Sequence, residues 1–456
     1  MSSPEDRAVA AAASLDLSAC ASLFDEVMRP VEGLFVRPEP RRTVRALVGG
    51  LLSSVERKNG WWLAERAGHR GPDAMQRLLT SVVWDHDRAR DSVRSLVADR
   101  LGHPDGVLIV DETGFLKKGS CSVGVGRQYT GTAGRIENSQ VAVFLTYASP
   151  RGRALVDRRL YLPRTSWCEA PERRAAAGVP DDVTFATKPE LAQQMVAAAL
   201  DAGMPVGWVT GDEVYGDNTA FRAFLRDRRV GYVLAVGCDT RVTLHARRDR
   251  ADRLATTLPD RCWQRYSAGQ GAKGPRDYDW AWVELAEGSP DRWLLVRRSP
   301  TTGELAYYLA WAATPQPLTT LVRVAGSRWA IEETFQAAKS QVGLDHYQVR
   351  RWIPWHRFIT LAMLALAFLA VLATSTNAVH DDPGSGHHDG AGPPPYLPDP
   401  RRPIPHTLAE LRHLLGHLIL NPVLDIAHLL HWSTWRRRHQ ARARHYHYRR
   451  RLNVDP

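Results

Sequence analysis

The chain has 456 residues, enough for two or three domains, and its 44% hydrophobic and 24% charged residues are ordinary for a soluble globular protein. Five scattered cysteines without a Cys-x-x-Cys pair argue against a zinc site or a disulfide framework and fit a reducing cytosol, and no secretory signal is predicted at the start. The net charge of +11 favours a polyanionic partner, although an arginine-rich composition also follows from a GC-rich genome.

Residues 1–101 are predicted to form a helical DNA-binding domain. A helical leader is expected over residues 1–35, and apolar residues at helical spacing predict a block of short helices over 41–101. Tight breaks at residues 59–60 and 68–72, together with several basic residues, favour a unit that resembles a helix-turn-helix. A plain helical subdomain that caps the core is an equally weighted alternative.

Residues 105–237 are predicted to form the first part of an α/β catalytic core. Four apolar residues, 107–110, run into Asp111, and a second strand at 206–211 runs into Asp212. Further strands are expected at 122–130, 140–147, 154–162 and 232–236, and helices at 189–202 and 219–229. Strand–helix alternation after a run of hairpins implies a mixed sheet with helices on its faces.

Residues 238–320 change character and are predicted to be an antiparallel β insertion. Three aromatic-rich runs, at 280–285, 293–296 and 307–311, read as its strands. The second part of the core is expected over residues 321–376. It includes a helix at 328–342 and a strongly apolar helix at 357–374, which we interpret as a buried core helix because it is short for a bilayer.

The end of the chain is predicted to be a flexible linker, 377–405, followed by a basic helical tail, 406–456. Residues 401–456 contain eleven arginines against three acidic residues, and Arg436, Arg437 and Arg438 are consecutive. These arginines are candidates for non-specific contacts to DNA, whose strength depends steeply on salt. A disordered basic end is the alternative interpretation of the tail.

Three carboxylates on separate elements form the candidate site. Asp111 and Asp212 follow strands, and Glu332 lies on the helix at 328–342, where Arg328 and Lys339 share its face at offsets of four and seven residues. Glu333 is turned roughly 100° away by the helical repeat and serves as the control. Carboxylates are hard ligands that suit divalent metals, and two metals can activate attack on a phosphodiester. The alternatives are turn aspartates and a solvated helix face.

The order of these elements resembles the DDE superfamily of insertion-sequence transposases, which share a ribonuclease H-like fold. Arg328, Glu332 and Lys339 match the Tyr-Arg-Glu-Lys signature of one group, which also carries a β insertion where residues 238–320 lie. Asp111-Glu112-Thr113 and Asp212-Glu213-Val214-Tyr215 resemble its first and second motifs, and residues 123–131, 187–189 and 343–350 look typical of one branch. The signature's Tyr, which helps to hold the transposon end in the wider group, is replaced by Ala325 here.

The resemblance implies that Asp111, Asp212 and Glu332 are the catalytic residues and hold two Mg²⁺ ions, for which Mn²⁺ can substitute. It also implies phosphate contacts by Arg328 and Lys339, to which we add Lys188 and Arg127. The expected partners are double-stranded DNA, at transposon ends and target, and a second copy of the chain during synapsis, in the bacterial cytoplasm at the nucleoid. Trp293 and Trp311 are candidates for holding a flipped base, but a core role is favoured for each.

The resemblance implies cut-and-paste transposition, in which each end is cleaved and the freed 3′-hydroxyl attacks target DNA. Two other functions stay open on the sequence alone: a metal-dependent nuclease on the same fold, and a catalytically silent DNA-binding protein derived from a transposase.

Overall fold

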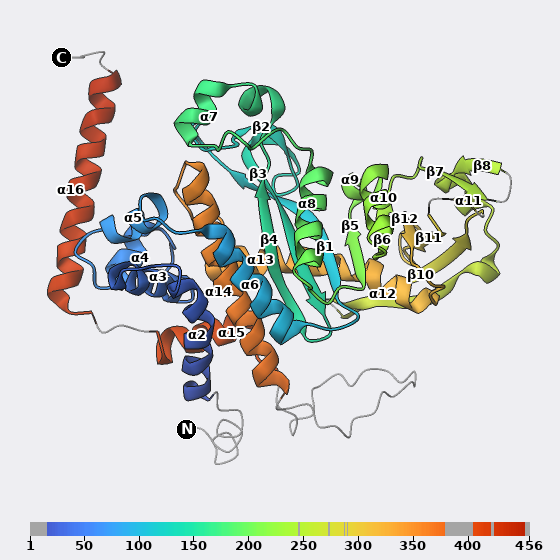
Figure 1. Ribbon diagram of the computed structural model, residues 1–456, viewed down its shortest axis with the longest axis horizontal. Helices are drawn as coiled ribbons and strands as arrows, with labels where there is room; N and C mark the ends of the chain where they lie inside the picture. Colours follow the sequence, from blue (N-terminus) through green and yellow to red (C-terminus); the bar gives the residue numbers. More distant parts are fainter. Residues whose placement is uncertain are drawn as a thin grey trace.

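The computed structural model describes residues 16–378, apart from 245–246, 272–273, 287 and 290, together with residues 405–420 and 424–451. The expected linker at 377–405 and the first part of the leader therefore fall largely outside the described residues. Figure 1 shows helices α2 to α6 on one side of a large sheet and the β insertion on the other.

A ten-stranded mixed sheet organises the fold, in the order β2-β3-β1-β5-β6-β12-β11-β10-β9, with β4 paired to β3. Its strands are β1 (Val107–Leu116), β2 (Gly126–Thr130), β3 (Arg135–Ser149), β4 (Gly152–Leu160), β5 (Trp208–Gly211), β6 (Gly231–Val236), β9 (Gln264–Gly271), β10 (Gly274–Glu284), β11 (Trp293–Arg298) and β12 (Leu305–Trp311). A separate two-stranded sheet pairs β7 (Arg241–Leu244) with β8 (Arg247–Arg250).

The central part of the sheet has the topology of a ribonuclease H-like fold. The strands β1, β3 and β4 form an antiparallel meander, and β5 and β6 add to β1 in parallel. The spatial order β4-β3-β1-β5-β6 therefore places the first strand of the meander at the centre, beside the two parallel strands. This order confirms the predicted fold class.

The insertion continues the central sheet. Strand β12 pairs antiparallel with β6, and β11, β10 and β9 follow outward. The three strands predicted from the aromatic-rich runs correspond to β10, β11 and β12. Trp293 is buried at 1% exposure and Trp311 stacks on Tyr232 with ring centroids 6.4 Å apart, so both tryptophans pack within the protein.

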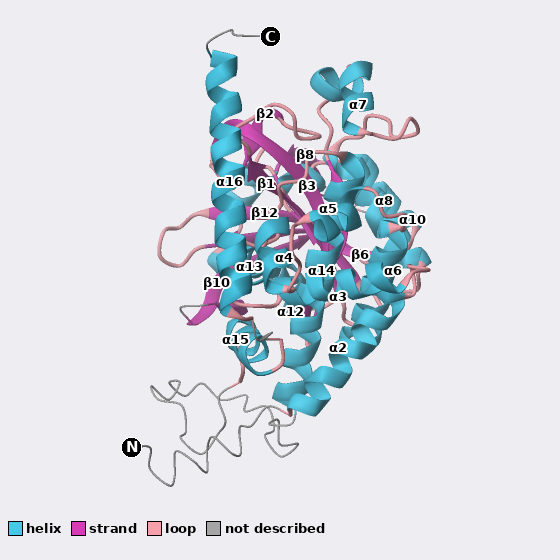
Figure 2. Cartoon of the chain, turned by 90° about the vertical axis from the view of Figure 1, so that its left-hand side faces the viewer, coloured by secondary structure: helices cyan, strands magenta, loops and turns pink. Residues whose placement is uncertain are grey.

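Helices cover both faces of the sheet, as the two views show (Figures 1 and 2). Those of the core are α8 (Lys188–Asp201), α9 (Glu213–Gly216), α10 (Thr219–Asp227), α12 (Leu318–Ser327), α13 (Trp329–Val342) and α14 (Trp352–Ala378). The insertion contains α11 (Ala251–Thr256), and α7 (Pro171–Ala177) lies in the connection after β4. On α13, the apolar face of Ile331, Phe335, Ala338 and Val342 is buried.

The N-terminal helices share one apolar core with the sheet. They are α2 (Leu17–Glu32), α3 (Pro38–Leu51), α4 (Gly60–Arg66), α5 (Asp73–Thr80) and α6 (His86–Leu101), and a continuous buried cluster joins them to the strands. Helix α14 is long and apolar enough to cross a membrane, but 83% of its apolar window is buried inside the protein. It packs against α2, α3, α5 and α6 as well as β4, as expected for a core helix.

Candidate active site

Asp111 and Asp212 occupy matching positions on two neighbouring parallel strands. Val110 of β1 pairs with Gly211 of β5, so the next residue of each strand is an aspartate. The predicted end of the first strand at Asp111 is wrong, because β3 continues to pair with β1 as far as Leu116. Strand β5, by contrast, does end at Gly211. Asp212 then caps α9 by accepting a 3.0 Å hydrogen bond from the Val214 N–H.

Glu332 faces the same region from the first turn of α13. The guanidinium of Arg328 lies between the carboxylates, 3.3 Å from Glu332 Oε1 and 3.9 Å from Asp111 Oδ2. Among the described residues, the three carboxylates do not form a group whose oxygens all lie within 4.8 Å of one another. An ion shared by all three therefore requires a change in side-chain position, and the Glu332 side chain is 46% exposed and ion-paired with Arg328.

The environment disfavours the charged forms of both aspartates. Burial, followed by the charges of Asp212 and Glu112, raises the pKa of Asp111 to about 7, against the opposing effect of Arg328. Burial and the Glu112 charge raise the pKa of Asp212 in the same way. Carboxylates that repel one another in a poorly hydrated place are stabilised by a cation, and their hard oxygens suit magnesium.

Glu112 and Glu333 point away from these carboxylates. Successive residues of a strand face opposite sides of the sheet, so Glu112 turns toward α8 and α9, where it forms an ion pair with Lys188 and accepts a 2.7 Å hydrogen bond from the Tyr215 hydroxyl. Glu333 forms a 2.6 Å ion pair with Arg153 of β4. Glu112 and Tyr215 belong to the first and second sequence motifs, but the hydrogen bond between them was not predicted. The alternation of side chains along a strand could have predicted that Glu112 and Asp111 face opposite sides of the sheet.

The predicted phosphate-binding residues have different surroundings. Lys339 donates a 2.8 Å hydrogen bond to Thr113 Oγ1, two residues beyond Asp111, and burial lowers its pKa. Lys188 is bound to Glu112, and Arg127 is exposed on β2.

The tail forms α15 (Leu408–Leu418) and α16 (Ile426–Arg451). Arg436 forms an ion pair with Glu65 of α4 and lies 4.9 Å from the centre of the Trp62 ring, while Arg437 and Arg438 are exposed. Figure 1 shows α16 at the outer side of α4 and α5, extending beyond them. Arg436 is therefore occupied within the protein, and its two neighbours face solvent.

A second acidic group is held by arginines. Ligand atoms of Asp85, His86 and Asp87 lie within 4.8 Å of one another at the start of α6. Asp87 lies 2.9 Å from Arg158, whose guanidinium is also 3.0 Å from His86 Nδ1, and Asp85 caps the helix. These contacts explain the group as a structural cap and leave no favourable place for a cation.

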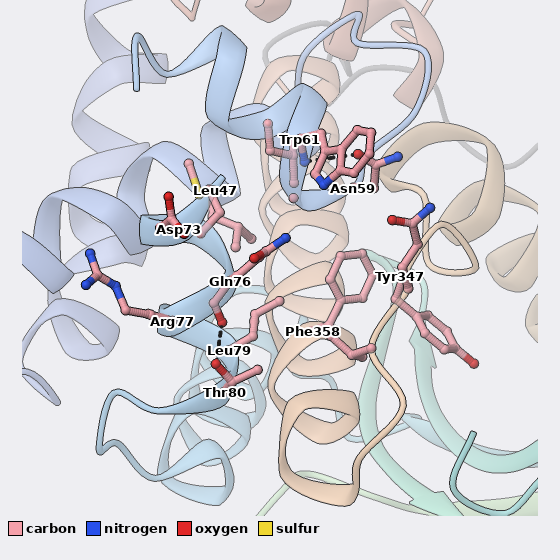
Figure 3. A pocket seen from close by; sticks show the side chains of 15 residues that line it. Leu47, Asn59, Trp61, Asp73, Gln76, Arg77, Leu79, Thr80, Tyr347 and Phe358 are labelled. Atoms are coloured by element: carbon pink, nitrogen blue, oxygen red, sulfur yellow. Dashed lines mark hydrogen bonds between the residues drawn. The ribbon is translucent and has the colours of Figure 1, made fainter. Parts of the chain in front are cut away.

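A cavity of about 350 Å³ lies between the N-terminal helices and the segment that follows α13. Its lining includes Trp61 of α4 and Gln76 of α5, which face Tyr347 and Phe358 (Figure 3). None of the three carboxylates lines this cavity.

Two family models match the chain. One, described as a DDE superfamily endonuclease, matches residues 30–265, and one described as a transposase DDE domain matches residues 186–368. The first match includes Asp111 and Asp212, and the second includes Asp212 and Glu332.

Two further proteins are similar to parts of the chain. A probable transposase for insertion sequence element IS701 from Microchaete diplosiphon is 28% identical over 213 residues, which are 46% of this chain and 53% of that protein. The chain thus spans about half the length of this curated relative. A solved piggyBac transposase synaptic complex with hairpin DNA aligns with a TM-score of 0.40 and 12% identity, over 81% of this chain and 77% of the other.

Proposed function

The chain belongs to the family of DDE superfamily endonucleases, and we propose that it is a DNA transposase that moves an insertion sequence by cut-and-paste transposition. The observation that carries this proposal is the placement of Asp111 and Asp212 on neighbouring parallel strands, with Glu332 facing them across Arg328. The three carboxylates come from three elements, and the Glu332 side chain is half-exposed, so that side of the site is open to water.

We propose that Asp111, Asp212 and Glu332 hold two Mg²⁺ ions, with Mn²⁺ as an alternative. Two such ions activate an attacking oxygen and stabilise the leaving oxygen of a phosphodiester. The three carboxylates would supply the negative charge that binds the ions. Because carboxylate ligands suit both magnesium and manganese, the donor set fits this assignment.

The neighbouring cations are proposed to hold the DNA. Arg328 can exchange its contacts with carboxylates for a contact with a phosphate near the cleaved bond, and Lys339 presents an ammonium beside Thr113. Lys188 would act mainly through Glu112, to which it is bound. Arg127, Arg437 and Arg438 are exposed and suited to phosphates farther from the site, and such contacts position DNA without reading its sequence.

The proposed partners are double-stranded DNA and, when two ends are brought together, a second copy of the chain. We also propose that the N-terminal helices recognise the ends; the alternative, a cap on the core, is supported by the apolar core that they share with the sheet.

The function is tested with duplexes taken from the DNA that flanks the gene. Wild-type protein with Mg²⁺ is expected to cleave these duplexes and to join the new 3′ ends to a target plasmid, and Asp212→Ala is expected to do neither. Products are separated on denaturing gels. Cleavage without joining would indicate a simple nuclease, and binding without cleavage would indicate a silent DNA-binding protein; either result overturns the proposal.

Stabilisation by Mg²⁺ is expected to grow as pH rises from 6 to 8. Asp111 has its folded pKa raised to about 7 from an ordinary value of 3.8, so its favourable contribution to stability is present below pH 4 and is lost as pH rises to about 7. Above pH 7 the carboxylate is free to bind metal, which stabilises the folded state.

The measurement is the midpoint of thermal unfolding at pH 6 and at pH 8, with and without Mg²⁺. A concentration of about 10 mM Mg²⁺ is used, which is on the order of what weak carboxylate sites need. The metal-dependent gain should be larger at pH 8 in the wild type and should be lost in Asp111→Asn. Equal gains at both pH values, or an unchanged gain in the variant, would contradict the assignment of Asp111 as a ligand.

A further inference from the structure

Two half-buried lysines without a carboxylate partner have their ammonium groups near the end of β1 that lies beyond Asp111. They are Lys117, which follows β1, and Lys339 of α13. Among the described residues, neither Lys117 nor Lys339 has a carboxylate oxygen within 4.0 Å, whereas Lys188 on the other face is paired with Glu112. An ammonium that has lost part of its hydration is costly unless an opposite charge replaces the water. These two lysines are therefore prepared for an anion from outside the chain.

The two lysines follow Asp111 in order along one side of the sheet. Asp111, Thr113 and Phe115 share a face because side chains alternate along a strand. The Lys339 ammonium contacts Thr113 Oγ1 at 2.8 Å and lies 5.8 Å from the centre of the Phe115 ring. Lys117 follows immediately after the strand ends, so the cations trace a path that leads away from the carboxylates.

Two aromatic rings, those of Phe115 and Tyr347, lie between the ammonium groups of Lys339 and Lys117. The Lys117 ammonium lies 3.8 Å from the centre of the Tyr347 ring, and that ring packs against Phe115 with centroids 5.4 Å apart. Tyr347 also lines the cavity between the N-terminal helices and the segment that follows α13 (Figure 3). The path therefore runs from the carboxylates past Lys339 to Lys117 and toward the N-terminal helices.

The fold holds Lys117 in place. Its backbone N–H donates a 2.9 Å hydrogen bond to the Asn138 carbonyl, and its own carbonyl accepts a 2.6 Å hydrogen bond from Asn138 Nδ2. The Tyr347 ring beneath the ammonium is fixed by a 2.9 Å hydrogen bond from its hydroxyl to Gln140 Oε1. A side chain whose backbone and aromatic support are held in this way loses less conformational freedom when it binds a ligand.

The charge state of Lys117 agrees with this geometry. Burial lowers the pKa of Lys117 to about 8, and the opposing effect comes from the negative charge of Asp345. Burial lowers the pKa of Lys339 as well. A nearby phosphate would restore the favourable environment that burial removes.

We propose that Lys117 is a further DNA-positioning residue, which binds a backbone phosphate of the strand that passes Lys339 on its way from the carboxylates toward the N-terminal helices. The proposal rests on the proposed function, because it names the path of the DNA that this site would cleave. Lys117 would set the register of the strand relative to the site and would take no part in the chemistry.

The test compares Lys117→Gln with Lys118→Gln, which removes the same charge from an exposed neighbour. Binding of labelled duplexes from the DNA flanking the gene is measured by fluorescence anisotropy over a series of salt concentrations. Lys117→Gln is expected to weaken binding about tenfold and to make the salt slope shallower by about 0.9. In cleavage assays the loss should appear in KM rather than in kcat. Lys117→Arg should restore binding, and Lys118→Gln should resemble the wild type.

A scan of single methylphosphonates locates the contact. One neutral linkage on the strand should weaken binding by the wild type, and the same linkage should have no further effect on Lys117→Gln. If every linkage affects both proteins equally, Lys117 does not bind a phosphate and the inference is wrong. Should Lys117→Gln fail to fold, the same comparison is made with Lys117→Met, which keeps the apolar stem over Tyr347. A wild-type protein that binds these duplexes but does not cleave them would overturn the proposed function and leave the Lys117 contact testable by the same scan.

Discussion

Replacing Glu332 with Gln is expected to lower the rate of DNA strand cleavage by about a thousandfold or more, whereas Glu333→Gln should cleave at nearly the wild-type rate. The two residues are adjacent on α13 and both are partly exposed, so the pair is closely matched. Glu332 faces Arg328 and the aspartates, while Glu333 is held by Arg153 on β4 at 2.6 Å. If Asp111 and Asp212 share a metal with this helix, as proposed, Glu332 is the residue of the two whose side chain faces it.

Single-turnover cleavage with saturating Mg²⁺ measures this effect. Binding of the same duplex in the absence of metal should differ little between Glu332→Gln and the wild type, because the substitution removes a ligand and leaves the neighbouring cations in place. If Glu333→Gln proves as damaging as Glu332→Gln, the assignment of the two faces of α13 is incorrect. An active Glu332→Gln would exclude Glu332 as a required ligand.

The strands and the helix that carry the three carboxylates could be predicted because each depends on a local pattern. A buried apolar strand that runs into an acidic residue can be read directly from residues 107–111 and 206–212, and the helical repeat separates Glu332 from Glu333. The contacts of Arg328 with Asp111 and of Lys188 with Glu112 join residues far apart in the sequence. No local period encodes such contacts, which depend on how β1, α8 and α13 pack in the finished fold.

The same distinction applies to the sheet. The strands of the insertion were predictable from their aromatic runs, but the pairing of β12 with β6 was not, since an edge strand carries no local mark of its partner. The continuation of β1 past Asp111 to Leu116 depends likewise on the length of β3. The apolar helix is buried in the core as predicted, but the argument from its length was wrong, because it runs over Trp352–Ala378 and is long enough to cross a membrane.

Asp157→Ala is expected to destabilise the protein by about 3–5 kcal/mol, and Asp91→Ala by about 1 kcal/mol or less. Asp157 of β4 is fully buried and lies 3.1 Å from Arg90 and 2.8 Å from Arg94 of α6. Asp91 contacts the same two arginines at 2.8 and 3.4 Å, but its side chain is 53% exposed. Both substitutions thus remove a carboxylate from the same pair of guanidinium groups, one inside the protein and one at its surface.

The expected difference in stability between the two variants follows from the hydration of the arginines. Removal of Asp157 leaves the guanidinium groups of Arg90 and Arg94, together with that of the buried Arg158, without their buried counter-charge, and water cannot reach them there. Removal of Asp91 exposes the arginines to solvent, which screens them. Urea unfolding, followed by far-UV circular dichroism, should show a large decrease in the midpoint urea concentration for Asp157→Ala only. Equal midpoints for the two variants would mean that Asp157 does not hold α6 against β4, and that apolar packing between α6 and α14 alone secures the N-terminal helices to the sheet.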